Sequence, residues 1–217
     1  KAFDQALADC AGCPGEPRLK QGRIGALAAA GKNDEAMKAS QDLLKQYPKE
    51  QGLNMAQGEV LEAMGDKDRA RLAYLREAEY FPRDPLSLVK LGILEASRNR
   101  PAEAEKAYRR ALEINSRNTD ALVMLAELLE KNGRTAEAAT LTERAIAADR
   151  EHPGALLRQA LDLQRKGQLD RALASYQACL QKQPGNPEVL YNLGTLYGQM
   201  QRNEPAERAY QNAIATG

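Results

Sequence analysis

Residues 85–118 read PLSLVKLGILEASRNRPAEAEKAYRRALEINSRN, and this stretch of 34 residues decides the fold. In its second half, small and apolar residues recur at steps of three and four, as they do on one face of a helix: Ala104, Ala107, Tyr108, Ala111 and Leu112. The first half has the same rhythm in Leu88, Leu91, Gly92 and Leu94. Pro101 lies between the halves, where a helix would break. The stretch therefore predicts two helices of about 13 residues joined by a short turn.

The same unit recurs along the whole chain. Its clearest mark is a column of alanines spaced 34 residues apart: Ala2, Ala36, Ala70, Ala104, Ala138, Ala172 and Ala206. A fixed period of this length indicates one helix pair stacked on copies of itself. We therefore expect an all-α solenoid of antiparallel helix pairs over residues 1–217, as a single array. Its repeats would be 17–50, 51–84, 85–118, 119–152, 153–186 and 187–217, after a partial repeat at 1–16.

Glycine and proline punctuate the repeats. All 10 prolines fall where helices should break. One glycine column suits the left-handed residue that ends a helix: Gly31, Gly65, Gly133 and Gly167. Asp84 and Asn186 each precede a proline and are expected to act as N-caps.

Two further columns concern packing. One is always small, and we expect it opposite the alanine column, so that the two helices of a pair approach closely: Gly58, Gly92, Ala126, Ala160 and Gly194. The other is aromatic, and we expect it to fill the space between neighbouring pairs: Tyr74, Tyr108, Tyr176 and Tyr210. Stacking is then the main source of stability, because no helix pair can bury its apolar face alone.

Composition excludes several classes of function. The net charge is +1, from 31 basic and 30 acidic residues, which argues against a broad nucleic-acid or membrane footprint. No apolar stretch approaches the length of a membrane span. With one histidine, no paired nucleophile and base, no metal-ligand cluster and no glycine-rich phosphate loop, the chain is not expected to be an enzyme or to hold a metal or cofactor.

No targeting signal is visible at the start of the chain. The compartment stays open, and a soluble protein of either the cytoplasm or the periplasm is expected. The chain begins and ends in mid-repeat, so we expect it to be part of a longer protein.

The three cysteines and the single histidine are expected to be structural or surface residues and not parts of a metal site. Cys179 falls on an apolar helix face and is expected in the core. Cys10 and Cys13 have the spacing of zinc knuckles and redox pairs, but a zinc site needs four ligands and no second pair exists. A local disulfide in an oxidising compartment remains open for them. His152 is expected on the surface of a turn between repeats.

These marks resemble those of the tetratricopeptide repeat family. That family has 34-residue helix pairs with a leucine–glycine pair in the first helix, then alanine, an aromatic residue and a second alanine in the second helix. One unit matches with Leu91-Gly92, Ala104, Tyr108 and Ala111, and another with Leu193-Gly194, Ala206, Tyr210 and Ala213. The first two units depart from the pattern at Lys20, Arg23, Asn54 and Gln57, so their packing or helix limits are expected to deviate. Glu77 replaces the second alanine in the unit beginning at Gln51, with Ala78 beside it.

The resemblance implies a right-handed superhelix whose concave surface is lined by the first helix of each pair. Residues one turn apart on those helices, with their flanking polar residues, would then face a groove: Met55, Glu59, Val89, Lys90, Ile93, Val123, Glu127, Leu157, Arg158, Leu161, Tyr191, Asn192 and Thr195. The middle of this row is apolar and rimmed by charge, as in grooves that bind a peptide or an amphipathic helix. The alternative is that some of these side chains pack against the next first helix. A clamp for a terminal carboxylate is not expected, since its positions hold mostly Val, Leu, Met and Glu.

The resulting functional hypothesis is a non-catalytic scaffold that binds a peptide or helical segment of a protein. Two alternatives remain open. One is a module that recruits partners to a catalytic or export domain outside this chain, and the other is a self-assembling scaffold that forms a homo-oligomer. Reading of RNA by a helical-repeat code would require a basic groove, which the sequence lacks.

Overall fold

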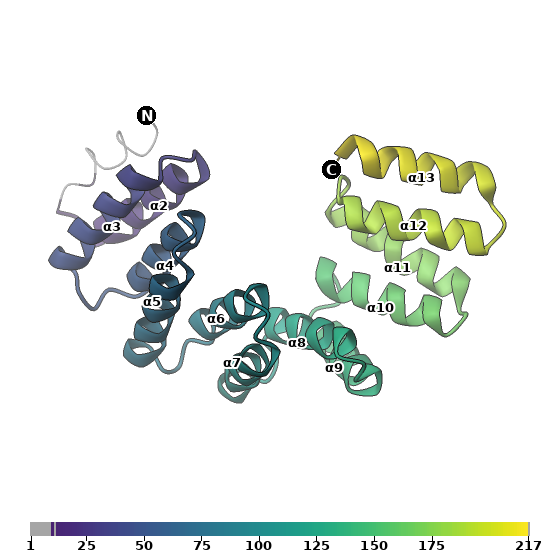
Figure 1. Ribbon diagram of the computed structural model, residues 1–217, viewed down its shortest axis with the longest axis horizontal. Helices are drawn as coiled ribbons and strands as arrows, with labels where there is room; N and C mark the ends of the chain where they lie inside the picture. Colours follow the sequence, from purple (N-terminus) through teal and green to yellow (C-terminus); the bar gives the residue numbers. More distant parts are fainter. Residues whose placement is uncertain (1–9, 11, 217) are drawn as a thin grey trace. The chain divides into compact units, whose positions relative to one another are not determined.

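The computed structural model describes residue 10 and residues 12–216, and within them it contains twelve α-helices and no strand (Figure 1). Their bounds are α2 Glu16–Ala29, α3 Asn33–Gln46, α4 Leu53–Ala63, α5 Lys67–Tyr80, α6 Leu86–Ser97, α7 Pro101–Ile114, α8 Thr119–Lys131, α9 Thr135–Ala148, α10 Pro153–Arg165, α11 Leu169–Lys182, α12 Pro187–Gln199 and α13 Asn203–Thr216. The helices follow one another in pairs with short turns, which confirms the predicted all-α repeat solenoid.

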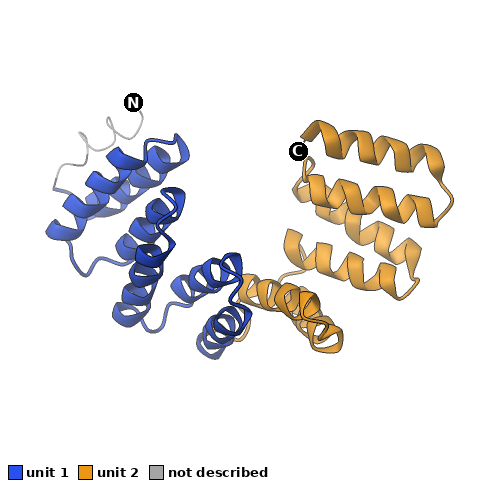
Figure 2. Cartoon of the chain, viewed as in Figure 1, with its two compact units in different colours: residues 1–114 blue, residues 115–217 orange. Residues whose placement is uncertain are grey.

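The chain divides into two compact units, residues 1–114 and residues 115–217 (Figure 2). In each unit the two helices of a pair pack together, and the second helix contacts the first helix of the next pair, as α5 contacts α6 and α9 contacts α10. Three first helices also touch the first helix of the next pair: α2 touches α4, α8 touches α10, and α10 touches α12. The division falls between α7 and α8, at the end of a pair. One continuous array and its right-handed superhelical twist stay predictions.

Helix starts follow the predicted frame closely. α8, α10 and α12 begin at Thr119, Pro153 and Pro187, the residues that open three of the predicted repeats. The Asn186 side chain accepts a hydrogen bond from the Val189 backbone N–H at 3.1 Å and so caps α12 as expected. Asp84 accepts from the Leu86 N–H at 3.0 Å. The exception is α4, which begins at Leu53, in one of the two units expected to deviate.

In the turn inside each pair, one residue adopts the left-handed backbone conformation, as the glycine column predicts. Gly31, Gly65, Gly133 and Gly167 have φ of 73°, 81°, 78° and 72°. The two remaining units place Asn99 and Gln201 in this column, and both also adopt positive φ, 56° and 57°. The repeat therefore imposes this backbone conformation even on residues with a Cβ, for which it is unfavourable.

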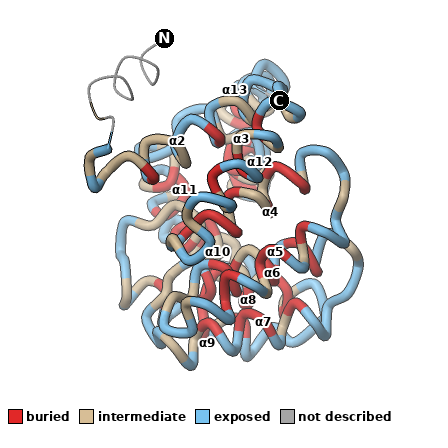
Figure 3. Tube along the Cα trace, turned by 90° about the vertical axis from the view of Figure 1, so that its left-hand side faces the viewer, coloured by how far each residue is buried: buried red, intermediate tan, exposed pale blue. Residues whose placement is uncertain are grey.

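Buried positions recur along every described helix (Figure 3). The alanine column is buried from Ala36 to Ala206, while Ala2 and most of the partial repeat 1–16 lie outside the described residues. The small column was predicted to lie opposite the alanine column, but it faces the tyrosine column instead. A Cβ at Gly58 would lie 2.5 Å from the ring of Tyr74 in the same pair, and Gly194 faces Tyr210 likewise. The glycines thus make room for the tyrosine rings of their own pair, and Tyr176 also joins a core cluster with Leu193 and Leu196 of the next pair, as expected.

Three expectations about single residues are resolved. Cys179 is buried, its thiol donates to the Pro153 carbonyl at 3.3 Å, and burial raises the pKa of that thiol. Cys10 and Cys13 form a disulfide. His152 is more than a surface residue, because its Nδ1 accepts from the Ala155 N–H at 3.3 Å and caps α10. Its Nε2 lies 3.1 Å from the Asp120 carboxylate, so the ring bridges two consecutive first helices.

Candidate functional site

The predicted groove residues fall into buried, paired and accessible sets. Val89, Val123 and Leu157, the centre of the expected apolar stripe, are only 3%, 3% and 7% exposed. The prediction that these three side chains face an open groove is wrong, because the surrounding helices cover nearly all of their surface. The alternative of packing between repeats describes them better.

The packing of α8 against α10 shows the reason for this burial. A Cβ at Gly154, near the start of α10, would lie 3.0 Å from Cγ1 of Val123. Leu157 belongs to a core cluster with Val189 and Leu193 of α12. Because α8 touches α10 and α10 touches α12, Val123 and Leu157 are covered by the next first helix.

The charged candidates are paired across first helices. Lys90 Nζ of α6 lies 2.7 Å from the Glu59 carboxylate of α4. Arg158 of α10 lies 3.2 Å from Glu130 of α8 and 3.2 Å from Glu188 of α12, and its side chain is 10% exposed. One guanidinium therefore connects three consecutive first helices, and its first role is to hold them together.

Charge pairing continues along α10. Arg165 contacts Glu130 at 2.7 Å and Asp162 at 3.1 Å, and Lys166 contacts Asp162 at 2.7 Å. Through Glu130, this chain of ion pairs joins the Arg158 cluster. Networks of this kind stabilise more than isolated surface pairs do.

The accessible candidates are fewer and more dispersed. Ile93 is 41% exposed and Tyr191 is 60% exposed. The Tyr191 ring lies 5.6 Å from the ring of Tyr210, at a 55° tilt, and forms an aromatic pair on α12 and α13. The remaining candidates are half-buried: Met55, Glu127, Leu161, Asn192 and Thr195.

Four predicted residues nevertheless meet in one place. A depression of about 200 Å³ in the second unit is lined by Val123 and Glu127 of α8 and by Leu157 and Arg158 of α10. We call it the α8–α12 depression. Residues that the sequence reasoning missed complete its lining: Met124, Pro153, Gly154, Cys179, Gln183, Asn186 and Glu188. Met124 occupies the repeat position of Lys90 and Arg158, so the frame could have identified it. Gln183 and Asn186 come from the turn before α12, where side-chain direction does not follow helical spacing.

The described residues contain no group of three or more His, Cys, Asp or Glu that could hold a metal ion. Within the same residues, no helix has the length and apolar character needed to cross a membrane. What the geometry offers is a surface of touching first helices with a shallow depression, ion pairs and a few accessible apolar side chains. That is the form of a helical repeat scaffold.

Comparisons with known proteins agree. A family model described as tetratricopeptide repeat matches residues 96–161 and 163–216, and a second model of the same description matches residues 25–87. These matches cover most of the chain, which therefore belongs to the tetratricopeptide repeat family, a family of protein–protein interaction scaffolds that are generally non-catalytic. No curated protein sequence is significantly similar to the chain.

Solved structures show the same fold at low identity. PilF of Pseudomonas aeruginosa has a TM-score of 0.74 at 16% identity, covering 100% of each chain. The Cut9–Hcn1 hetero-tetramer of the APC/C has a TM-score of 0.82 at 13% identity, covering 100% of this chain and 42% of the other. YrrB, a tetratricopeptide repeat protein with an unusual peptide-binding site, has a TM-score of 0.57 at 21% identity, covering 83% of this chain and 93% of the other.

Proposed function

We propose that the chain binds an extended or helical segment of a protein partner on its first helices, with the α8–α12 depression as the centre of the site. The observation that carries the proposal is this depression, which brings Glu127 and Arg158 together beside the Met124 side chain. Methionine suits such a surface because its flexible thioether adapts to different partners. The peptide-binding site named for YrrB supports this use of the fold.

The charges of the depression favour a partner segment of mixed polarity. Glu127 pairs with Lys131 at 2.7 Å, and Arg158 pairs with Glu188, so both signs are offered at short range. Half-buried apolar contact comes from Met124 and Pro153 in the lining and from Leu161 farther along α10. A segment with one or two apolar side chains between polar ones fits this lining better than a wholly apolar helix.

Site-specific photo-crosslinking tests the proposal. A photoreactive residue would replace Met124, and in a matched variant the exposed Thr140 of α9, outside the depression. We expect one partner segment to be crosslinked through position 124 and not through position 140. Equal crosslinking at both positions, or none at position 124 from a partner that still binds, would contradict the site.

Self-association is the second candidate, and two exposed apolar side chains favour it. Ile214 of α13 is 82% exposed and Tyr191 of α12 is 60% exposed. Light scattering of the unmodified chain and of an Ile214→Glu, Tyr191→Glu variant would distinguish the two functions. A dimer that this variant converts to a monomer would support self-association, and a monomer in both would leave the segment-binding function as the better candidate.

A further inference from the structure

The packing of α9 against α10 differs from that of α5 against α6 and of α11 against α12. Three repeat positions hold one tyrosine and two leucines where α5 meets α6 and where α11 meets α12: Tyr74, Leu91 and Leu94, and then Tyr176, Leu193 and Leu196. Where α9 meets α10, the same positions hold Thr142, Gln159 and Asp162. All three positions are thus polar in this junction, whereas the junction of α3 and α4 has two polar residues, Ser40 and Gln57, and keeps an apolar third, Val60.

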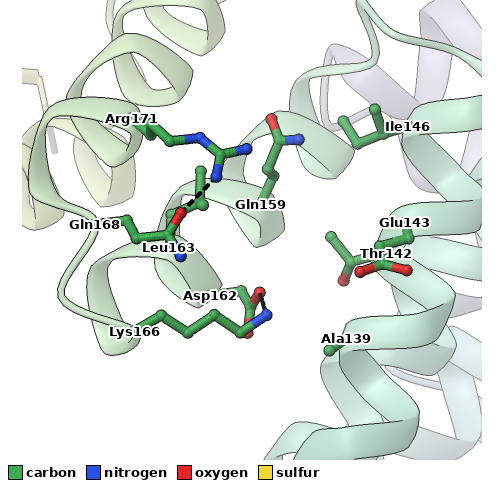
Figure 4. Close-up of a pocket in the computed structure, with 10 residues that line it drawn as sticks. All are labelled: Ala139, Thr142, Glu143, Ile146, Gln159, Asp162, Leu163, Lys166, Gln168 and Arg171. Atoms are coloured by element: carbon green, nitrogen blue, oxygen red, sulfur yellow. Dashed lines mark hydrogen bonds and ion pairs between the residues drawn. The ribbon is translucent and has the colours of Figure 1, made fainter.

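A cavity of about 230 Å³ lies at this junction, which we call the α9–α10 cavity (Figure 4). Thr142 and Glu143 reach it from α9, Gln159 and Asp162 reach it from α10, and Lys166 reaches it from the turn that follows α10. Such a volume is large enough for several ordered waters or for a ligand of a few heavy atoms.

The backbone does not require the smaller residue at position 142. Thr142 belongs to the same pair as Ala126, and the pair of α10 and α11 has alanine at the matching position, Ala160. There Ala160 and Tyr176 share one core cluster, and both are fully buried. A tyrosine at position 142 would therefore fit beside Ala126. Polar groups and unfilled volume cost stability in a core, and such costs are typical of functional positions.

The charges in the cavity are arranged in two opposed walls. Glu143 stands on α9, while Lys166 and Arg171 stand on the opposite side, just after α10 and at the start of α11 (Figure 4). Lys166 is neutralised by Asp162 at 2.7 Å. Glu143 forms no hydrogen bond or ion pair within residues 12–216. Within the same residues, the Arg171 guanidinium donates a hydrogen bond to one side chain, that of Gln168. One carboxylate and one guanidinium thus face each other across the cavity without a charged partner.

Hydrogen-bonding groups lie between the walls. The Oε1 atom of Gln159 accepts from the Ser175 hydroxyl at 3.0 Å, which leaves the amide nitrogen of Gln159 as a donor. The Thr142 hydroxyl donates to the Ala138 carbonyl at 3.0 Å and keeps its lone pairs for an incoming donor. Ile146 and Leu163 add an apolar part to the lining.

We propose that the α9–α10 cavity binds a free α-amino acid. Its ammonium group would face the Glu143 carboxylate and the Thr142 oxygen, and its carboxylate would face Arg171 and the Gln159 amide. Its side chain would lie against Ile146 and Leu163, which favours small aliphatic side chains. Because the four charges of the lining sum to zero, a zwitterion fits better than an ion of either sign.

Calorimetric titration and thermal melting with each protein amino acid test the proposal. We expect saturable binding of at least one small aliphatic amino acid, with a Kd of about 1 mM or lower. Two analogues of that amino acid serve as controls: the amine that lacks its carboxylate and the carboxylic acid that lacks its ammonium group. Each should bind at least about tenfold more weakly than the amino acid. Absence of saturable binding by any of the amino acids would overturn the proposal.

Variants at position 142 separate binding from folding. Thr142→Tyr should fill the cavity with the residue that Tyr74 and Tyr176 provide at this repeat position, abolish binding and raise the melting temperature by about 2–4 °C. Thr142→Ser keeps the cavity open and should retain binding. Glu143→Gln, on the exposed part of α9, should weaken binding about tenfold without changing the melting temperature. Binding that survives Thr142→Tyr unchanged would overturn the assignment to this cavity.

Discussion

The backbone N–H of Gly52 donates a hydrogen bond of 2.5 Å to the Oε1 atom of Glu77, a carboxylate that is 2% exposed. The other carboxylate oxygen accepts from the Asn54 N–H at 3.2 Å. Glu77 belongs to α5, so the second helix of this pair caps the first. The helix α4 has no capping side chain of its own, and an anion at its N-terminus is favourable.

Glu77→Ala restores the alanine of the family pattern and should nevertheless destabilise the chain. The N–H groups of Gly52 and Asn54 would lose their buried acceptor, at a cost of about 2 kcal/mol. Urea unfolding measures the change, and Glu79→Ala, two residues away and exposed, is the matched control. An equal, small effect of both substitutions would show that the cap is unimportant.

Gly58 and Tyr74 should be energetically coupled. Gly58→Ala would place a Cβ 2.5 Å from the Tyr74 ring, so we expect a net loss of about 1–2 kcal/mol. In a Tyr74→Thr background, which reproduces the pairing of Ala126 with Thr142, the same change should gain up to about 1 kcal/mol from helix propensity. A double-mutant cycle by chemical denaturation measures this reversal of sign. Additive effects would contradict the close packing of ring and glycine.

The helix frame could be predicted from the sequence because its signals are local. Thr119 and Pro187 open helices where the repeat predicts, and Asn99 adopts positive φ at the glycine position. The burial of Val123 and Leu157 could not be predicted in this way. Whether a column faces a groove or the next first helix depends on the angle between neighbouring helices, and helical spacing contains no information about that angle.

Glu95 should be replaceable by leucine without loss of stability. It is 1% exposed in α6, at a repeat position that holds Leu129 in a later pair, and it lies 2.6 Å from Arg71 Nε and 3.5 Å from Arg100. Glu95→Leu should change the unfolding free energy by between about zero and +3 kcal/mol. Arg71→Ala should instead cost about 2 kcal/mol or more, because the buried carboxylate keeps only its longer contact. Thermal or urea unfolding of both variants decides this, and a strong loss with Glu95→Leu would contradict it.

The buried tyrosines predict loss of stability at alkaline pH. Burial, together with the hydrogen bond from its hydroxyl to Glu62, raises the pKa of Tyr74 well above its usual value, and burial raises the pKa of Tyr176. The folded state therefore favours the neutral phenols. Their contribution to stability is present below the unfolded pKa of about 10 and is lost as the pH rises above it.

We expect Tyr74 and Tyr176 to form phenolate only as the chain unfolds. Ultraviolet absorbance during an alkaline titration, with circular dichroism on the same samples, measures both events. Tyr176→Phe should reduce the part of the phenolate signal that accompanies unfolding. Full ionisation of all the tyrosines before any loss of helix would contradict the expectation.

Two adjacent residues of α8 distinguish core from binding surface. Val123 is 3% exposed against the start of α10, so Val123→Glu would bury an unpaired carboxylate and cost about 3 kcal/mol or more. Met124 is half-buried in the lining of the α8–α12 depression, so Met124→Glu should change stability by less than about 1 kcal/mol. If the depression binds the partner, Met124→Glu should weaken binding at least about tenfold in a folded chain, as measured by calorimetry with the crosslinked segment as a peptide. Unchanged affinity in a folded Met124→Glu variant would show that the partner does not contact position 124. The binding site would then lie elsewhere on the first helices.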